Sequence, residues 1–136
     1  MDNLTIEKRS WNMSRIRGRN TKPEIRVRSL LHRMGFRFRL KNDKLPGKPD
    51  IILSKYKTTI FIHGCFWHRH MNCKNNYTPK SRTDFWMNKF NANIKRDKQI
   101  SENISNIGWN QLIIWECETN NEEQLTKKIK DFLFGT

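Results

Sequence analysis

The chain has 136 residues, with 27 lysines and arginines against 13 aspartates and glutamates, which gives a formal net charge of +14. This length is enough for one domain with its own hydrophobic core, and no apolar run is long enough to cross a membrane. The N-terminus has no signal-peptide core, so we expect a cytoplasmic protein whose three cysteines are metal ligands or inert thiols rather than disulfides.

The positive charge is concentrated in the first third of the chain. Residues 1–50 hold 14 basic and 5 acidic side chains, whereas residues 51–136 hold 13 and 8. We expect residues 1–20 to be a basic arm that orders on a polyanionic partner, the alternative being a solvated basic face that only keeps the protein soluble. The candidate phosphate contacts of this arm are Arg15, Arg17 and Arg19.

A helix and an edge strand are predicted next. Thr21 and Glu24 form a capping box, and apolar residues at helical spacing extend the helix until Gly35. Residues 36–40 alternate apolar side chains with arginines, which predicts an edge strand with one basic face. We therefore expect Glu24 to act first as a cap, and His32, in the middle of the helix, to be structural.

Three further strands and two helices complete the chain. One strand begins at Asp50 after a Pro-Gly-Lys-Pro turn, and a second extends from Thr59 to Ile62. The remaining predicted elements are a long helix from residue 83 to 108, a buried strand at 111–117 and a helix at 121–134. This order of elements predicts an α/β fold with a mixed sheet and helices on both faces, with Trp109 and Trp115 in the core.

Metal-ligating side chains are concentrated between Pro46 and Cys73. Cys65, His70 and Cys73 lie in one loop, and Cys117 at the end of the last strand would supply a fourth nitrogen or sulfur ligand for a structural zinc ion. Such a site would use every cysteine and tie the loop to the sheet. The alternative is three small buried thiols and an exposed histidine.

Three further polar residues of this stretch suit hydrolytic chemistry. The Asp50 carboxylate can hold Mg²⁺ through oxygen, and a neutral imidazole of His63 or His68 can take a proton from water. Metal-assisted phosphodiester hydrolysis needs both kinds of group. The alternatives are that Asp50 caps a turn and that either histidine is a supporting or core residue.

Aromatic residues are numerous beside these groups. Phe66 and Trp67 lie in the loop and Trp86 near the start of the long helix. A flat ring beside a basic surface can stack on a base or insert between base pairs, although such a ring more often belongs to the core.

Several motifs together carry a resemblance to a known family. The segments RSWNMSRIRGRNTKPE, LPGKPDIIL, IFIHGCFWHRH, RTDFW, NIKRD and LIIWEC closely resemble the very short patch repair (Vsr) DNA mismatch endonucleases, in order and spacing, over nearly the whole chain. The resemblance implies one domain over residues 1–136 with a restriction-endonuclease-like fold and a structural zinc. It also implies a Mg²⁺-dependent enzyme that nicks one strand 5′ of the thymine in a T·G mismatch left by deamination of 5-methylcytosine.

The resemblance also implies roles for individual residues. Asp50 would bind Mg²⁺ together with the main-chain oxygen of Ile62, His68 would be the general base, and His63 and Glu24 would support them. The implied zinc ligands are Cys65, His70, Cys73 and Cys117, and the residues implied to enter the duplex are Phe66, Trp67 and Trp86.

Two positions depart from the family pattern. Ile62 stands where some members have threonine, which matters only if that side chain, rather than the main-chain oxygen, contacts the metal. The spacing between His70 and Cys73 is one residue longer than in some members, which a loop can absorb.

The implied partner is double-stranded DNA with a T·G mismatch, followed by mismatch-repair proteins and a repair polymerase. We expect a monomer at the bacterial nucleoid. Two alternatives remain at this point. A restriction or defence nuclease on the same fold would use the same groups on another target, whereas a non-catalytic zinc-stabilised DNA-binding module would have no use for Asp50 with His68.

Overall fold

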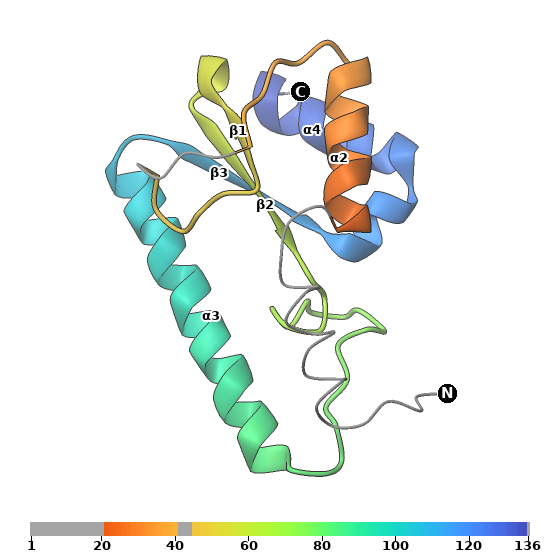
Figure 1. Cartoon of the computed structure of the whole chain (residues 1–136), viewed down its shortest axis with the longest axis vertical. Helices are drawn as coiled ribbons and strands as arrows, with labels where there is room; N and C mark the ends of the chain where they lie inside the picture. The colour runs from red at the N-terminus through yellow and green to blue at the C-terminus, as the bar shows by residue number, and fades with distance from the viewer. Residues whose placement is uncertain (1–20, 41–44, 136) are drawn as a thin grey trace.

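The computed structural model describes residues 21–40 and 45–135, so the predicted basic arm with Arg15, Arg17 and Arg19 lies outside the described residues. The described part is an α/β fold in which three α-helices surround a three-stranded sheet. In chain order the elements are α2 (Lys22–Arg33), β1 (Ile51–Leu53), the 3-10 helix η1 (Ser54–Tyr56), β2 (Thr58–His63), α3 (Thr83–Asn106), β3 (Asn110–Trp115), the 3-10 helix η2 (Glu116–Asn120) and α4 (Glu122–Phe134) (Figure 1).

The sheet is mixed, as predicted, with the strand order β1-β2-β3. β1 pairs with β2 in antiparallel fashion, with Ile51 opposite Ile60, and β2 pairs with β3 in parallel, with Ile60 opposite Leu112. Because α3 is the crossover between β2 and β3, the parallel pair is a β-α-β unit. Both parallel strands therefore end at the same edge of the sheet, where His63 and Trp115 lie opposite each other.

The helices cover both faces of the sheet. α2 and α4 lie together on one face, and α3 crosses the other (Figure 1). Alternation along the strands explains this arrangement, because successive side chains point to opposite faces. The core between the sheet, α2 and α4 consists of Val27, Leu30, Leu31, Ile51, Leu53, Ile60, Leu112, Ile114, Leu125 and Ile129.

The helix ends follow the sequence signals. The Thr21 hydroxyl accepts a hydrogen bond from the main-chain N–H of Glu24 at 3.4 Å, which satisfies one of the open donors of α2. Asn121 caps α4 in the same way, accepting from Gln124 N–H at 3.0 Å. None of the helices in the described part of the chain is long and apolar enough to span a membrane.

The predicted edge strand over residues 36–40 is reduced to a single bridge. Arg39 exchanges two main-chain hydrogen bonds with Ile52, at 3.0 and 2.8 Å, and forms no longer ladder. β1 is only three residues long, so it offers few partners. The apolar residues Phe36 and Phe38 instead pack against the core cluster, and this packing accounts for the alternation in the sequence.

Three other expectations need correction. Trp109 and Trp115, expected in the core, are both half-buried. Cys117, expected at the end of the last strand, lies in η2, because β3 ends at Trp115. The chain turns there as the Glu118 carboxylate accepts a hydrogen bond from the Trp115 N–H at 2.8 Å.

Candidate functional site

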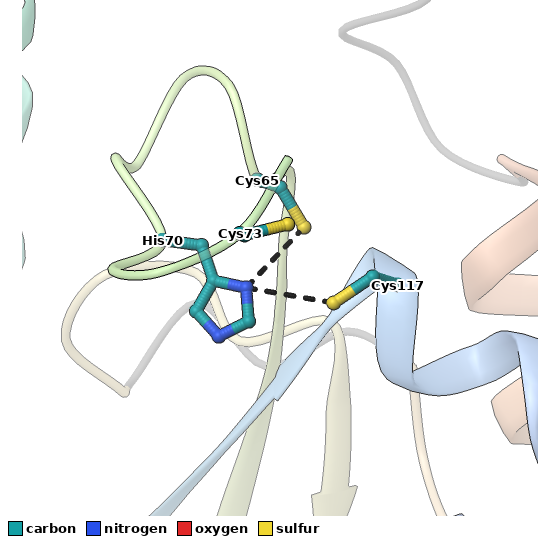
Figure 2. A group of neighbouring side chains, drawn as sticks. All are labelled: Cys65, His70, Cys73 and Cys117. Carbon is teal, nitrogen blue, oxygen red and sulfur yellow. Dashed lines mark hydrogen bonds between the residues drawn. The ribbon is translucent and has the colours of Figure 1, made fainter. Parts of the chain in front are cut away.

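Three cysteines and one histidine meet at the edge of the sheet. Cys65, His70 and Cys73 come from the loop after β2, and Cys117 comes from η2 on the opposite side (Figure 2). Their ligand atoms all lie within 4.8 Å of one another. The Nδ1 atom of His70 is 3.6 Å from the Cys65 sulfur and 3.5 Å from the Cys117 sulfur.

The dimensions of this Cys/His cluster fit a tetrahedral zinc ion. Zinc binds thiolate at about 2.3 Å and imidazole at about 2.0–2.1 Å, so tetrahedral geometry places sulfur and nitrogen roughly 3.6 Å apart. The observed distances of 3.6 and 3.5 Å agree with that value. Three thiolates and one imidazole form a donor set typical of structural zinc.

Neighbouring side chains hold the Cys/His cluster in place. The His70 ring stacks on Trp115, with centroids 4.2 Å apart and an interplanar angle of 10°. The Glu116 carboxylate accepts a hydrogen bond from the Cys65 N–H at 3.0 Å. Burial raises the pKa of the Cys65 thiol to about 12, so this cysteine keeps its proton at neutral pH unless a cation stabilises the thiolate.

A second group of side chains lies on the α3 face of the sheet. The His68 Nδ1 atom is 2.6 Å from a carboxylate oxygen of Asp97 on α3. The His68 ring also stacks on the ring of His63, the last residue of β2, with centroids 3.9 Å apart and an interplanar angle of 9°. Burial is the main cause that lowers the pKa of His63 to about 4, so this imidazole is neutral at pH 7.

The sequence places Asp97 only on the predicted long helix, in an uneven row of apolar residues at helical spacing. The signal that identifies it is a carboxylate among those apolar positions, in the segment NIKRD. Its partner, His68, is 29 residues away in the chain, so the pair becomes visible only when α3 is folded against the loop.

Asp50 lies immediately before β1 and faces the end of β2. Its carboxylate accepts a hydrogen bond from the main-chain N–H of Ile62 at 2.7 Å. Burial raises the pKa of Asp50 to about 6, against the opposing effect of the Ile62 hydrogen bond. Since the N–H and C=O of one strand residue point to the same side, the carbonyl oxygen of Ile62 also lies toward Asp50.

Glu24 lies close enough to influence this centre. It is 8% exposed, and its carboxylate forms a 2.9 Å ion pair with Arg28 one turn along α2. The negative charge of Glu24 raises the pKa of Asp50, while Arg28 and His68 lower it. The structure therefore brings Glu24, Asp50, His63 and His68 to one end of the sheet.

Phe66 lies at the centre of an aromatic cluster. Its ring centroid is 5.1 Å from that of Trp67 and 5.6 Å from that of Trp86, and all three side chains are half-buried. Phe90 of α3 lies below them, 5.2 Å from Phe66, and is 1% exposed. Phe66 and Trp86 therefore pack on the buried Phe90 ring, and Trp67 packs on both of them.

The similarities to known proteins extend over nearly the whole chain. The sequence model of the family described as DNA mismatch endonuclease Vsr matches residues 1–75. The type II nicking enzyme V.NmeAIP of Neisseria meningitidis serogroup A is 44% identical, over 96% of this chain and 97% of its own. The type II nicking enzyme V.XorIIP of Xanthomonas oryzae pv. oryzae is 41% identical over 97% and 96%, and the DNA mismatch endonuclease Vsr of Escherichia coli is 39% identical over 93% and 84%.

Proposed function

The chain belongs to the Vsr family of DNA mismatch endonucleases, and on that premise we propose that it nicks one strand of a DNA duplex 5′ of the thymine in a T·G mismatch. Cleavage would require Mg²⁺ and would begin very short patch repair of deaminated 5-methylcytosine. The observation that best supports hydrolysis is the arrangement of Asp50 beside Ile62, with the His68–Asp97 pair nearby.

Asp50 and Ile62 fit a magnesium site. A carboxylate oxygen and a carbonyl oxygen are the hard ligands that Mg²⁺ prefers, and water and phosphate oxygens complete its shell in such enzymes. A bound Mg²⁺ supplies positive charge that stabilises the negative charge developing on the scissile phosphate. The Ile62 N–H fixes the Asp50 carboxylate, and this role does not depend on whether the side chain at position 62 is isoleucine or threonine.

His68 is the proposed general base. Its Nδ1 atom is engaged by Asp97, which favours the tautomer with the proton on Nδ1 and leaves Nε2 free to accept a proton from water. His63 stacks on this ring while remaining neutral, so it orients His68 without introducing a positive charge. Glu24 contributes through Arg28 and through its negative charge near Asp50.

The rest of the assignment concerns binding and stability. We assign the Cys/His cluster to a structural zinc ion and the exposed edges of Phe66, Trp67 and Trp86 to insertion beside the mismatch. Residues 1–136 would form one restriction-endonuclease-like domain that acts as a monomer at the nucleoid, with Arg15, Arg17 and Arg19 on the phosphates. Mismatch-repair proteins and a repair polymerase would follow it on the nicked duplex.

The decisive experiment measures single-turnover nicking of one T·G duplex and its T·A counterpart, with and without Mg²⁺. We expect Asp50→Ala to abolish nicking while T·G binding persists, since removing a carboxylate near DNA also relieves repulsion. We expect His68→Ala to lose roughly 10²–10⁴-fold in rate and to recover in part as hydroxide replaces the base at high pH.

His32→Ala is the matched control, because this histidine is exposed on α2, and it should cut like the wild type. Near wild-type nicking by Asp50→Ala in Mg²⁺ would mean that Asp50 does not hold the catalytic metal. Absence of nicking by the wild type on either duplex would leave a non-catalytic zinc-stabilised binding module as the better account. Equal nicking of T·G and T·A duplexes would instead indicate a restriction or defence nuclease. This alternative is consistent with the two relatives that are named type II nicking enzymes.

A further inference from the structure

The aromatic cluster has an outer member that the proposed function does not use. Tyr77 is 61% exposed, whereas Phe66, Trp67 and Trp86 are half-buried. The Tyr77 ring lies against Phe66, with centroids 5.0 Å apart and an interplanar angle of 42°. Of these four rings, Tyr77 therefore offers the most face to a base, and Phe66 supports it from below.

One arginine fixes Tyr77 in this position. Arg69 donates a hydrogen bond from Nη1 to the main-chain oxygen of Tyr77 at 2.8 Å and another from Nη2 to the Thr78 hydroxyl at 3.0 Å. The guanidinium carbon lies 3.9 Å above the centre of the Phe90 ring on α3. A longer contact of 3.5 Å joins Nη1 to the main-chain oxygen of Phe66. Arg69 thus connects the loop segments at Phe66 and at Tyr77–Thr78 to Phe90 of α3.

Arginine is well suited to this position. Its planar guanidinium can stack on a ring with its face while it donates hydrogen bonds in the plane, and lysine offers neither geometry. Arg69 adopts a left-handed backbone conformation, with φ of +57°, which non-glycine residues seldom adopt. This costs backbone energy, and the contacts of the side chain offset it.

We propose that Tyr77 is a further DNA-binding residue of this enzyme, whose ring stacks on a base displaced at the mismatch, and that Arg69 is the positioning residue that holds it against Phe66. Stacking on an aromatic ring suits any unstacked base, and a base in a mismatch unstacks at lower cost than a paired one. The inference rests on the proposed function, because it needs a duplex whose bases are displaced.

The first arm of the test compares Tyr77→Ala, Tyr77→Phe and the wild type. Binding is measured without Mg²⁺ to T·G and T·A duplexes that carry 2-aminopurine beside the central pair, whose fluorescence rises when the base unstacks. We expect Tyr77→Ala to bind the T·G duplex roughly 5- to 100-fold more weakly and to lose part of the fluorescence rise. Tyr77→Phe retains the ring and should keep most of both signals.

Phe134→Ala is the matched control for an exposed ring. Phe134 is 54% exposed and stacks on Phe36, on α4 and away from the loop, so its loss should leave T·G preference unchanged. Equal weakening of both duplexes by Tyr77→Ala, or no weakening of either, would overturn the inference. A wild type without T·G preference would overturn the proposed function first, so the two failures are distinguishable.

The second arm tests Arg69. We expect Arg69→Lys to resemble Tyr77→Ala in its lost T·G preference, while the salt dependence of binding stays that of the wild type. Arg26→Lys is the control, because Arg26 also makes two side-chain hydrogen bonds but on α2. If Arg69→Lys binds normally and Arg69→Ala lowers the salt slope by about 0.9, Arg69 is a phosphate ligand and the positioning role is wrong. If the Arg69 variants do not fold, the Tyr77 variants decide alone.

Discussion

Asp50 carries a carboxylate that the fold makes costly to ionise. Burial raises its pKa to about 6 from an ordinary value of 3.8, so the folded state holds this proton more tightly than the unfolded chain does. The stability that this proton contributes is complete below the unfolded pKa and is lost as pH rises to the folded pKa. Above pH 6 the buried carboxylate is ionised and lowers the free energy of unfolding by its full amount, and a bound cation would offset this loss.

We therefore predict that Asp50→Asn stabilises the protein at pH 7–8 in the absence of added Mg²⁺, by about 1–3 kcal/mol. The gain should disappear near pH 3, below the ordinary pKa of 3.8, where the carboxyl is protonated in both the folded and the unfolded state of the wild type. Added Mg²⁺ should raise the melting temperature of the wild type and leave that of the variant unchanged. Asp84→Asn is the control. The exposed Asp84 carboxylate lies in the first turn of α3, where a negative charge stabilises the helix, so this variant should be no more stable than the wild type at pH 7–8. A variant that melts below the wild type at pH 8 would contradict the prediction.

Asp97 and His68 should act as one unit in the chemical step. The 2.6 Å contact holds the imidazole and fixes its tautomer, so Asp97→Asn should lower the single-turnover nicking rate by about 10²-fold while T·G binding is kept. The double variant Asp97→Asn with His68→Ala should be no slower than His68→Ala alone, because residues that act together are non-additive. Multiplied losses in the double variant would mean that Asp97 acts independently of His68.

The loop between β2 and α3 depends on the Cys/His cluster for its attachment to the sheet. Residues 64–82 contain no helix or strand, and Cys117 ties them to η2. We predict one tightly held zinc per chain in elemental analysis, and its loss in Cys117→Ser together with a lower melting temperature, since binding energy at such a site is folding energy. His32→Ala should keep the metal. A folded, active preparation without metal would contradict the assignment.

Helix starts could be predicted from the sequence, whereas strand pairing could not. The helix starts at Thr21 and Asn121 were predictable because capping is local, decided within three or four residues. The strand predicted over residues 36–40 was wrong, because pairing depends on a partner, and β1 supplies only Ile52. Alternating apolar and polar residues indicate only that one side of a segment is buried. Phe36 is packed against the core although its segment forms no β-ladder.

In the candidate site, too, the sequence predicts what is local and misses the contacts made by packing. Cys65, His70 and Cys73 are close in sequence, so their spacing predicts a shared metal, and the structure places their ligand atoms together with that of Cys117. His68 and Arg69 each also contact a residue of α3, Asp97 and Phe90 respectively, and only the packing of that helix against the loop identifies these two contacts. Spacing alone contains no information about that packing.

The charge of the whole chain determines how strongly it should bind any duplex. Of the net charge of +14, residues 1–20 contribute +3, from five basic and two acidic side chains. Each phosphate neutralised by the protein releases counterions and adds about 0.9 to the slope of log affinity against log salt. This slope therefore reports how many phosphates the basic residues of a given segment contact.

We predict that removal of residues 1–20 lowers the salt slope by about 2–4, because Lys8, Arg9, Arg15, Arg17 and Arg19 would lose their phosphates together. The slope is measured with a T·G duplex between low and physiological salt, for the full chain and the truncated one. Lys130→Ala is the control, because Lys130 is an exposed cation on α4, which contributes no residue to the candidate site, and the slope of this variant should match that of the full chain. If truncation weakens binding equally at every salt concentration, residues 1–20 contact the DNA at groups other than the phosphates, and the prediction is wrong. An unchanged slope and affinity would leave the rest of the basic surface, rather than the arm, as the part that binds the DNA backbone.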